Sequence, residues 1–276
     1  MDKVKLVVFD LDGTLVDTMG SFANHAATLM ERHYGLLHET GYSQYIKTSG
    51  LPFRQQLEVL FPRNHKNAYV AHQFEEWKVE NLDDASFRPE VEDIFDGLRD
   101  LGLQIAISSN NLQQNVDHVS QQFPSQIDTV LGFRDDKFHK GEPHFQWLET
   151  HHNVDRSEMI FVGDSLNDCR IAMDCEVPFL AFPTTFSIEQ FLSVDPNVDH
   201  VDPITGIVAW IEESQGQIRT TELPMADSSF SPWIGRNASA SRSDRILKRP
   251  TSRGWRPITT STALWTWSRL HFWQIP

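Results

Sequence analysis

The sequence predicts an α/β protein: a parallel sheet covered by helices, with an all-helical segment inserted after the first strand. Five short apolar runs alternate with stretches whose apolar residues recur at helical spacing. Residues 4–9 and 159–162 are almost continuously apolar, as expected for strands buried on both faces of a parallel sheet. Between residues 19 and 85 no strand pattern is clear, so we expect a helical insertion there.

The first strand, Val4 to Phe9, ends abruptly in two acids, Asp10 and Asp12, followed by Gly13. Two acids and a glycine are poor strand material, so the chain leaves the sheet here and presents both carboxylates at the strand's carboxyl edge. In open α/β sheets this edge is where ligands bind. Such a pair can also simply turn the chain, but the strand before it and the helical pattern after it favour a functional site.

The insertion is predicted to hold helices over residues 20–33, 51–61 and 66–82. Cations in this segment could meet a distal anionic group of a substrate, although a solvated place on a helix face is the alternative for each. Arg54 is preferred because the turn at residues 48–52 opens its helix. The other three candidates are Arg32, Lys47 and Lys78.

The α/β pattern resumes near Phe87 with a helix that ends at Gly102. The next strand, residues 103–109, runs into a polar cluster: Ser108, Ser109, Asn110 and Asn111. We then expect a helix over 112–123, a strand over 129–133 and a helix from Phe145. Strands at 159–162 and 178–182 and a helical region at 204–211 complete the pattern.

Acids also follow the strand at 159–162, where Asp164 and Asp168 are one helical turn apart at a helix start. These carboxylates, gathered at the same sheet edge as Asp10 and Asp12, would repel one another unless a positive charge lay among them. Hard oxygen ligands suit Mg²⁺, which needs only one or two protein carboxylates. The sequence therefore predicts a magnesium site.

Taken in order, these segments resemble the four motifs of the haloacid dehalogenase-like superfamily of aspartyl-nucleophile phosphohydrolases, in the subgroup of phosphoglycolate phosphatases and β-phosphoglucomutases. The resemblance covers about residues 4–214. It implies a Rossmann-like core formed by residues 1–18 and 86–215, and a cap formed by residues 19–85 that closes over the site and selects substrates.

The resemblance also implies roles for residues of this sequence. Asp10 would be the nucleophile and Asp12 the general acid and base. Ser109, Asn110 and Lys140 would bind the substrate phosphate. Ser108 replaces Ser109 if the register is shifted by one residue, and Lys140 is preferred over Lys137, which lacks the Gly/Pro turn that follows. The implied magnesium ligands are Asp10, the backbone carbonyl of Asp12, Asp164 and, in or near the first shell, Asp168.

The expected function is a Mg²⁺-dependent phosphatase that hydrolyses a small phosphorylated metabolite through an aspartyl-phosphate. Asp12 argues against a dehalogenase, which needs no such acid to release halide. A sugar-phosphate mutase of the same superfamily is the alternative enzyme, and a non-catalytic binding or scaffold protein is less favoured because the residues of all four motifs are present.

The net charge of −14 is divided unevenly along the chain. Residues 219–276 carry +6 and the remainder carries −20, a balance that disfavours nucleic acid and membrane surfaces as partners. The basic segment 216–276 is of low complexity, rich in Ser, Thr and Trp, and its composition predicts disorder. Two cysteines, the lack of a signal peptide and the lack of any long apolar run lead us to expect a soluble cytoplasmic protein.

Overall fold

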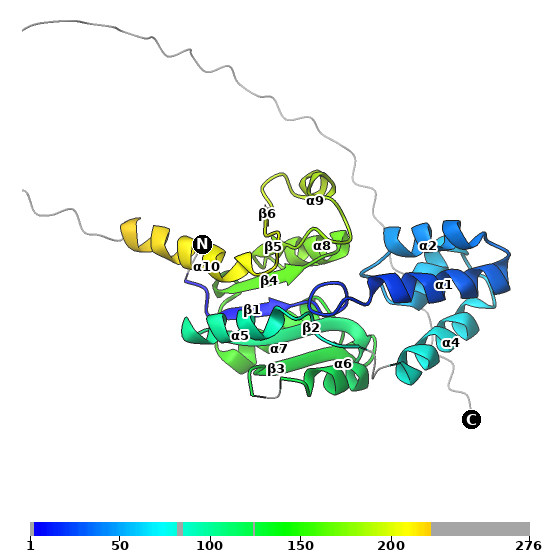
Figure 1. Cartoon of the computed structure of the whole chain (residues 1–276), viewed down its shortest axis with the longest axis horizontal. Coiled ribbons are helices and arrows are strands. Elements are labelled where there is room, and N and C mark those ends of the chain that lie inside the picture. The colour runs from blue at the N-terminus through cyan, green and yellow to red at the C-terminus, as the bar shows by residue number, and fades with distance from the viewer. Residues whose placement is uncertain (1–2, 82–84, 124, 222–276) are drawn as a thin grey trace, which may run out of the picture. The chain divides into compact units, whose positions relative to one another are not determined.

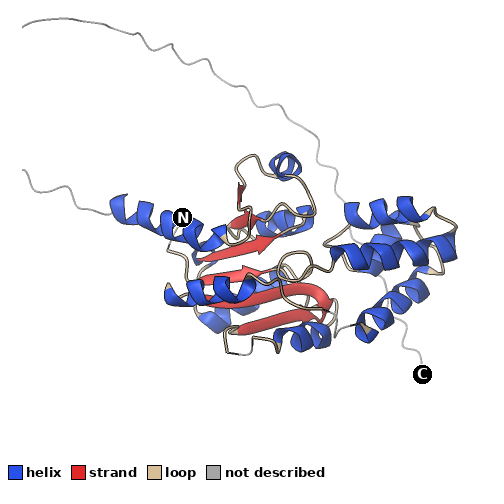
Figure 2. Cartoon of the chain, in the orientation of Figure 1, coloured by secondary structure: helices blue, strands red, loops and turns tan. Residues whose placement is uncertain are grey.

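The structure is a computed structural model that describes residues 3–81, 85–123 and 125–221. Its centre is a parallel sheet with the strand order β3-β2-β1-β4-β5-β6 (Figure 1). Helices flank this sheet (Figure 2), which confirms the predicted α/β class. The strands are β1 Leu6–Phe9, β2 Gln104–Leu112, β3 Thr129–Phe133, β4 Met159–Gly163, β5 Phe179–Ala181 and β6 Asp199–His200.

Strand β1 occupies the middle of the sheet, with β2 on one side and β4 on the other. Val8 pairs with Ala106 of β2 and with Phe161 of β4. The chain builds the sheet outward through β2 and β3 and then returns to the other side of β1 to place β4. The strand order therefore reverses between β1 and β4, and ligands bind outside the carboxyl ends of strands at such a reversal.

Alternating side chains of the central strands pack into two separate layers. Val7 and Phe9 of β1 face a cluster shared with α5 Val91–Asp100, α6 Gln113–Ser120 and α10 Gly206–Thr221. Leu6 and Val8 face the opposite cluster, shared with α7 Glu142–His152 and α8 Leu166–Asp174. Apolar residues on both faces are required because helices cover both sides of the sheet. A smaller cluster holds α9 Ile188–Val194 against the end of the sheet.

The segment between β1 and α5 is helical in its described part, and its helices share an apolar cluster of their own around Met30, Phe53 and Phe74. Figure 1 shows α1, α2 and α4 gathered together. The predicted helices at 20–33, 51–61 and 66–82 correspond to three of the four observed ones. The helices are α1 Met19–Tyr34, α2 His38–Lys47, α3 Phe53–Leu60 and α4 Asn67–Glu80.

Helix α2 was not predicted because its sequence, HETGYSQYIK, has no apolar stripe and carries a glycine in its interior. Only Gly41 and Tyr45 of this helix are buried. A Cβ at Gly41 would lie 3.0 Å from the Cα of Ala27, so the glycine allows α2 to pack closely against α1. Tertiary packing rather than helix propensity therefore accounts for this element.

Two further elements differ from the sequence prediction. Strand β2 continues through the polar cluster to Leu112, with a shift of register between Ser108 and Leu112. Strand β6 is only two residues long and exposed, which leaves no apolar pattern to predict it.

The last helix extends beyond the expected end of the core at residue 215, because α10 runs to Thr221. The prediction of disorder concerns residues that lie, from 222 onward, outside the described part of the chain. In the described portion no helix has the length and apolar character needed to cross a membrane.

Candidate active site

The carboxyl ends of β1, β2 and β4 border a cavity of about 70 Å³ that the helical insertion covers from the other side. Of the eight site residues expected from the sequence, six line this cavity and Asp168 lies directly behind it, bonded to Lys140. Arg54 does not line it. The six are Asp10, Asp12, Ser109, Asn110, Lys140 and Asp164.

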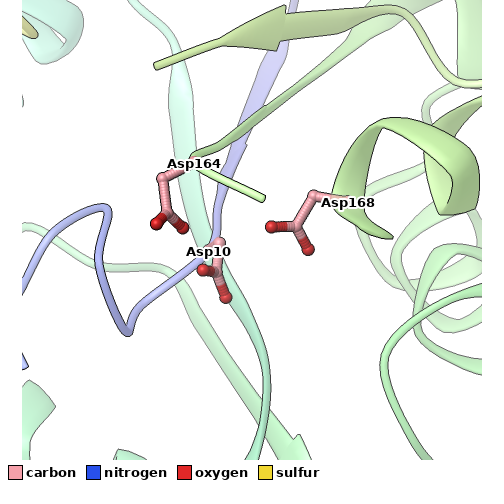
Figure 3. Close-up of side chains that lie close together, drawn as sticks. All are labelled: Asp10, Asp164 and Asp168. Carbon is pink, nitrogen blue, oxygen red and sulfur yellow. The ribbon is translucent and has the colours of Figure 1, made fainter. Parts of the chain in front are cut away.

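Three buried acids, Asp10, Asp164 and Asp168, point toward one another (Figure 3), with one carboxylate oxygen of each within 4.8 Å of the others. The Lys140 ammonium donates to Asp10 Oδ1 at 2.6 Å and to Asp168 Oδ1 at 2.7 Å. Three carboxylates thus share one cation, which leaves an excess of negative charge among buried side chains.

This shortage of positive charge shifts the protonation equilibria of the cluster. Burial raises the pKa of Asp10 well above its ordinary value, against the favourable charge of Lys140 and with added repulsion from Asp168 and Asp164. Burial, followed by the charge of Asp168, raises the pKa of Asp164 to about 7. The pKa of Lys140 is raised although burial opposes it, because Asp10 and Asp168 stabilise its charged form.

The cluster fits a hard divalent cation. All of its donors are oxygens, and two positive charges would compensate the excess of negative charge. Two hydroxyls help to orient Asp164: Thr14 Oγ1 lies 3.3 Å from its Oδ1, and Thr185 donates to its Oδ2. The chemistry of these donors therefore suits Mg²⁺.

Local backbone structure explains how these acids come together. Gly13 has a φ of +91°, and a Cβ there would lie 2.3 Å from Asp164 Oδ2, so the turn after Asp10 requires glycine. At the start of α8, Ser165 and Asp168 form a capping box. One oxygen of Asp168 is held by that box, while its other oxygen accepts from Lys140.

Asp12 stands apart from the cluster of three acids and is held by neutral donors. The Thr18 hydroxyl donates to its Oδ1 at 2.9 Å, and Asn111 Nδ2 donates to its Oδ2 at 3.1 Å. Both of its carboxylate oxygens are therefore oriented within the cavity wall. The backbone carbonyl of Asp12 as a metal ligand stays a prediction.

The two serines at the end of β2 face different surroundings. Ser108 is buried against His144, with 2.9 Å between its hydroxyl and Nδ1. Burial, with the nearby charge of Lys140, lowers the pKa of His144 to about 3, so this imidazole is neutral. Ser109 lines the cavity, and its hydroxyl accepts a hydrogen bond from the backbone N–H of Asn111 at 3.0 Å. Of the two registers considered from the sequence, the one with Ser109 lies at the cavity.

The cations of the insertion are also placed differently from one another. Arg54, the preferred candidate, is exposed on α3, and Arg32 and Lys47 are exposed as well. Lys78 of α4 is 8% exposed and lines the cavity. Its ammonium lies 2.7 Å from Glu75 Oε2 and 3.0 Å from Asn111 Oδ1. Lys137, the alternative to Lys140, is exposed in the loop before α7.

Several contacts at the site were not expected from the sequence, among them one made by Asn110, which was itself an expected phosphate-binding residue. Asn110 Nδ2 and Asn167 Nδ2 both donate to the carbonyl of Gly50, at 2.9 and 3.1 Å, and so bind the loop between α2 and α3 to the core. The hydroxyls of Thr14 and Thr185 donate hydrogen bonds to the Asp164 carboxylate. Thr14 lies two residues after Asp12 and Asn111 belongs to the polar cluster at the end of β2, whereas nothing in the sequence around Thr185 or Asn167 signals their contacts.

Comparison with known proteins agrees with this geometry. A phosphoglycolate phosphatase of Vibrio parahaemolyticus is 26% identical over 178 residues, which cover 60% of this chain and 77% of the relative. A phosphoglycolate phosphatase of Aliivibrio fischeri is 24% identical over 193 residues, covering 62% and 80%.

Among solved structures, a "predicted phosphatase" from Clostridium acetobutylicum aligns with a TM-score of 0.66 at 18% identity, covering 76% of this chain and 99% of that one. A haloacid dehalogenase-like family hydrolase from Streptococcus pneumoniae aligns with a TM-score of 0.63 at 18% identity, covering 76% and 100%. At this identity the likeness concerns the fold. A family model of haloacid dehalogenase-like hydrolases matches residues 7–182, more than half of the sequence, and the chain belongs to that family.

Proposed function

We propose that this protein is a Mg²⁺-dependent phosphatase that hydrolyses a small phosphomonoester through an aspartyl-phosphate on Asp10. The observation that carries the proposal is the buried cluster of Asp10, Asp164 and Asp168 around Lys140, at the strand reversal and open to a cavity. The names of the sequence relatives make 2-phosphoglycolate the first substrate to test.

In this proposal Asp10 is the nucleophile. Its Oδ1 is bound by Lys140, while its Oδ2 has only the Thr14 hydroxyl at 3.5 Å. In the first step an Asp10 oxygen attacks phosphorus, the bond between phosphorus and the ester oxygen breaks, and Asp12 gives its proton to that oxygen. In the second step Asp12 takes a proton from water, whose oxygen attacks phosphorus and releases phosphate and free Asp10.

The remaining residues would stabilise the negative charge of the phosphoryl oxygens and of the Asp10 carboxylate during the reaction. The Ser109 hydroxyl and the Asn110 side chain are donors in the cavity wall for phosphoryl oxygens, and Lys140 offsets the charge at Asp10. Magnesium, held by Asp10, Asp164 and the Asp12 carbonyl with Asp168 alongside, would offset the repulsion between the nucleophile and the phosphate.

The helical insertion, residues 19–85, serves in this proposal as the cap that closes the site. It supplies Tyr45, Ser49 and Phe53 to the cavity wall, and the Gly50 carbonyl ties it to the core. The cavity volume, about 70 Å³, is well below the roughly 300–1,000 Å³ of sites for drug-sized ligands. A cap over so small a space suits a substrate with a short leaving group.

The test is phosphate release by the full chain from a panel of small phosphomonoesters, with Mg²⁺ and with a chelator. We expect release that requires Mg²⁺ and that falls at least about 10⁴-fold in Asp10→Asn, a loss of about 5.5 kcal/mol of transition-state stabilisation. Asp17→Asn, at an exposed acid of the same loop, is the matched control and should keep full activity.

Three results would count against the proposal. If no ester in the panel released phosphate, the phosphatase proposal would be rejected. If Asp10→Asn kept more than a tenth of the wild-type activity, Asp10 would be rejected as the nucleophile. Accumulation of an isomeric sugar phosphate in place of free phosphate would identify the mutase instead.

A further inference from the structure

We propose that Lys78 is a positioning residue for the general acid and base: through Asn111, it holds the Asp12 carboxylate in place. The inference rests on the proposed role of Asp12 and adds a residue from the helical insertion to the acid-base machinery of the core. Three consecutive contacts, from Glu75 to Lys78, from Lys78 to Asn111 and from Asn111 to Asp12, carry it.

Lys78 is a largely buried cation in the cavity wall. Its side chain is 8% exposed, and its ammonium lies 5.6 and 5.5 Å from the ring centres of Phe22 and Phe74. Burying a cation is costly unless it is paired and hydrogen-bonded. Its described partners are the Glu75 carboxylate at 2.7 Å and Asn111 Oδ1 at 3.0 Å.

The bond from Lys78 is one of three that fix which way the Asn111 carboxamide faces. Asn111 Oδ1 also accepts from the Leu112 amide and from Asn115 Nδ2, each at 2.9 Å. A flipped carboxamide would set its NH₂ group against an ammonium and two N–H donors, so the oxygen must stay on that side. The Asn111 NH₂ group consequently faces Asp12 and donates to Oδ2 at 3.1 Å.

Asp12 is thereby held through both oxygens, from two different parts of the fold. Thr18, at the start of the insertion, holds Oδ1, and Asn111, at the end of β2, holds Oδ2. A general acid has to meet the leaving oxygen within hydrogen-bond reach, so a carboxylate free to rotate would lose rate even if it kept its proton.

The same geometry argues against Lys78 as the binder of a distal anion on the substrate. The Glu75 carboxylate, also in the cavity wall, already balances its charge. The pair therefore offers a second anion little net attraction. Because Lys78 belongs to the insertion and Asn111 to the core, the bond between them exists only while the insertion is seated against the core.

The experiment compares wild type, Lys78→Met, Asn111→Ala and the double variant on three esters. These are 2-phosphoglycolate, ethyl phosphate, which has no distal charge, and p-nitrophenyl phosphate, whose nitrophenolate leaves without needing a proton. Lys47→Met is the matched control, because Lys47 is an exposed cation of the same insertion. Circular dichroism and thermal unfolding of each variant establish that it is folded.

We expect Asn111→Ala to lower kcat on the two alkyl esters by about 10- to 100-fold, a partial loss of the roughly 10²- to 10⁴-fold that general acid catalysis supplies. Lys78→Met should lower kcat by about three- to tenfold, because Leu112 and Asn115 still orient Asn111 in that variant. KM should change by less than about threefold, and the first-turnover burst of nitrophenolate should stay within about threefold of wild type. The double variant should be no slower than Asn111→Ala, since both substitutions interrupt one chain of contacts.

Different results overturn different claims. Unchanged kcat on ethyl phosphate in both variants, or an equal loss in the nitrophenolate burst, would overturn the positioning role. A rise in KM confined to 2-phosphoglycolate would assign Lys78 to the substrate's carboxylate instead. Should Lys78→Met fail to fold because the Glu75 carboxylate is left unpaired, the double variant Glu75→Gln/Lys78→Met removes both charges and takes its place in the comparison. If the wild-type protein hydrolysed none of the three esters, the proposed phosphatase activity would be overturned, and with it this inference.

Discussion

At the scale of single residues, the site is governed by the ratio of three buried carboxylates to one lysine. Asp10, Asp164 and Asp168 lie around Lys140 and are all buried. Burial therefore favours the protonated form of an acid, and the pKa values of Asp10 and Asp164 rise accordingly. A divalent cation reverses this preference because it binds the ionised carboxylates.

The raised pKa values make a prediction about pH. Unfolded, Asp164 titrates near 3.8, and folded without metal it titrates near 7. Between these values the folded state holds a proton that the unfolded state has lost, so stability without metal falls as pH rises from about 4 to 7. Mg²⁺ competes with that proton, so the gain in Tm on adding Mg²⁺ should be larger at pH 8 than at pH 5.

Thermal unfolding at the two pH values, with Mg²⁺ and with chelator, checks this prediction. Asp164→Asn, which cannot ionise at that position, should show a smaller difference between the two gains. An equal gain at both pH values in the wild type would mean that these carboxylates do not titrate as described.

The sequence singled out the acids and the lysine that line the cavity. Among the cations of the insertion it favoured Arg54, whereas the one that lines the cavity is Lys78. Asp10, Asp12 and Asp164 follow strands, and parallel strands bring their carboxyl ends to one edge whatever the packing. Lys140 lies in the loop before α7 and was expected from the family resemblance. Arg54 and Lys78 lie on helices, where the sequence does not specify which side of a polar face meets the core. Contacts such as that of Asn111 with Lys78 join distant parts of the chain and have no local signal.

At the scale of elements, the loop between α2 and α3 joins the insertion to the core. Gly50 has a φ of +87°, and its carbonyl accepts bonds from Asn110 and Asn167. A Cβ at Gly50 would lie 2.6 Å from Ser165 Oγ and 2.7 Å from Asn167 Cβ. The loop can approach this closely only as glycine.

Gly50→Ala is therefore expected to hinder seating of the insertion while leaving each part folded. We predict that kcat/KM falls at least about tenfold, because the cavity wall supplied by the insertion is displaced. Gly20→Ala in α1 is the matched control, since nothing lies within 4 Å of a Cβ there. Steady-state kinetics of both variants checks the prediction, and equal kcat/KM values would show that the loop tolerates the added methyl group.

Elements with a strong apolar period were predicted and those without one were not. Helix α5 has its apolar residues on one face and was expected at its place. Helix α2 and strand β6 form because neighbouring elements hold them, and their own sequences carry little pattern. The extension of β2 to Leu112 likewise depends on pairing with β3 rather than on composition.

At the scale of the whole molecule, the site exists because the strand order reverses. Strands β1 and β4 are neighbours although about 150 residues separate them, and only this pairing brings Asp10 beside Asp164. The sequence pattern predicted the class of fold and the edge that carries the site. It could not predict how the insertion is seated against the core, because that arrangement depends on individual side-chain contacts between distant parts of the chain.

The central claim is the covalent intermediate on Asp10, and trapping it is the most direct test. The measurement is an acid quench of a single turnover with ³²P-labelled phosphoester in Mg²⁺, followed by peptide mapping of the label. We predict that the label maps to the peptide containing Asp10 and that borohydride converts Asp10 to homoserine. Label on another residue, or phosphate released in the first turnover without any labelled protein, would contradict the account.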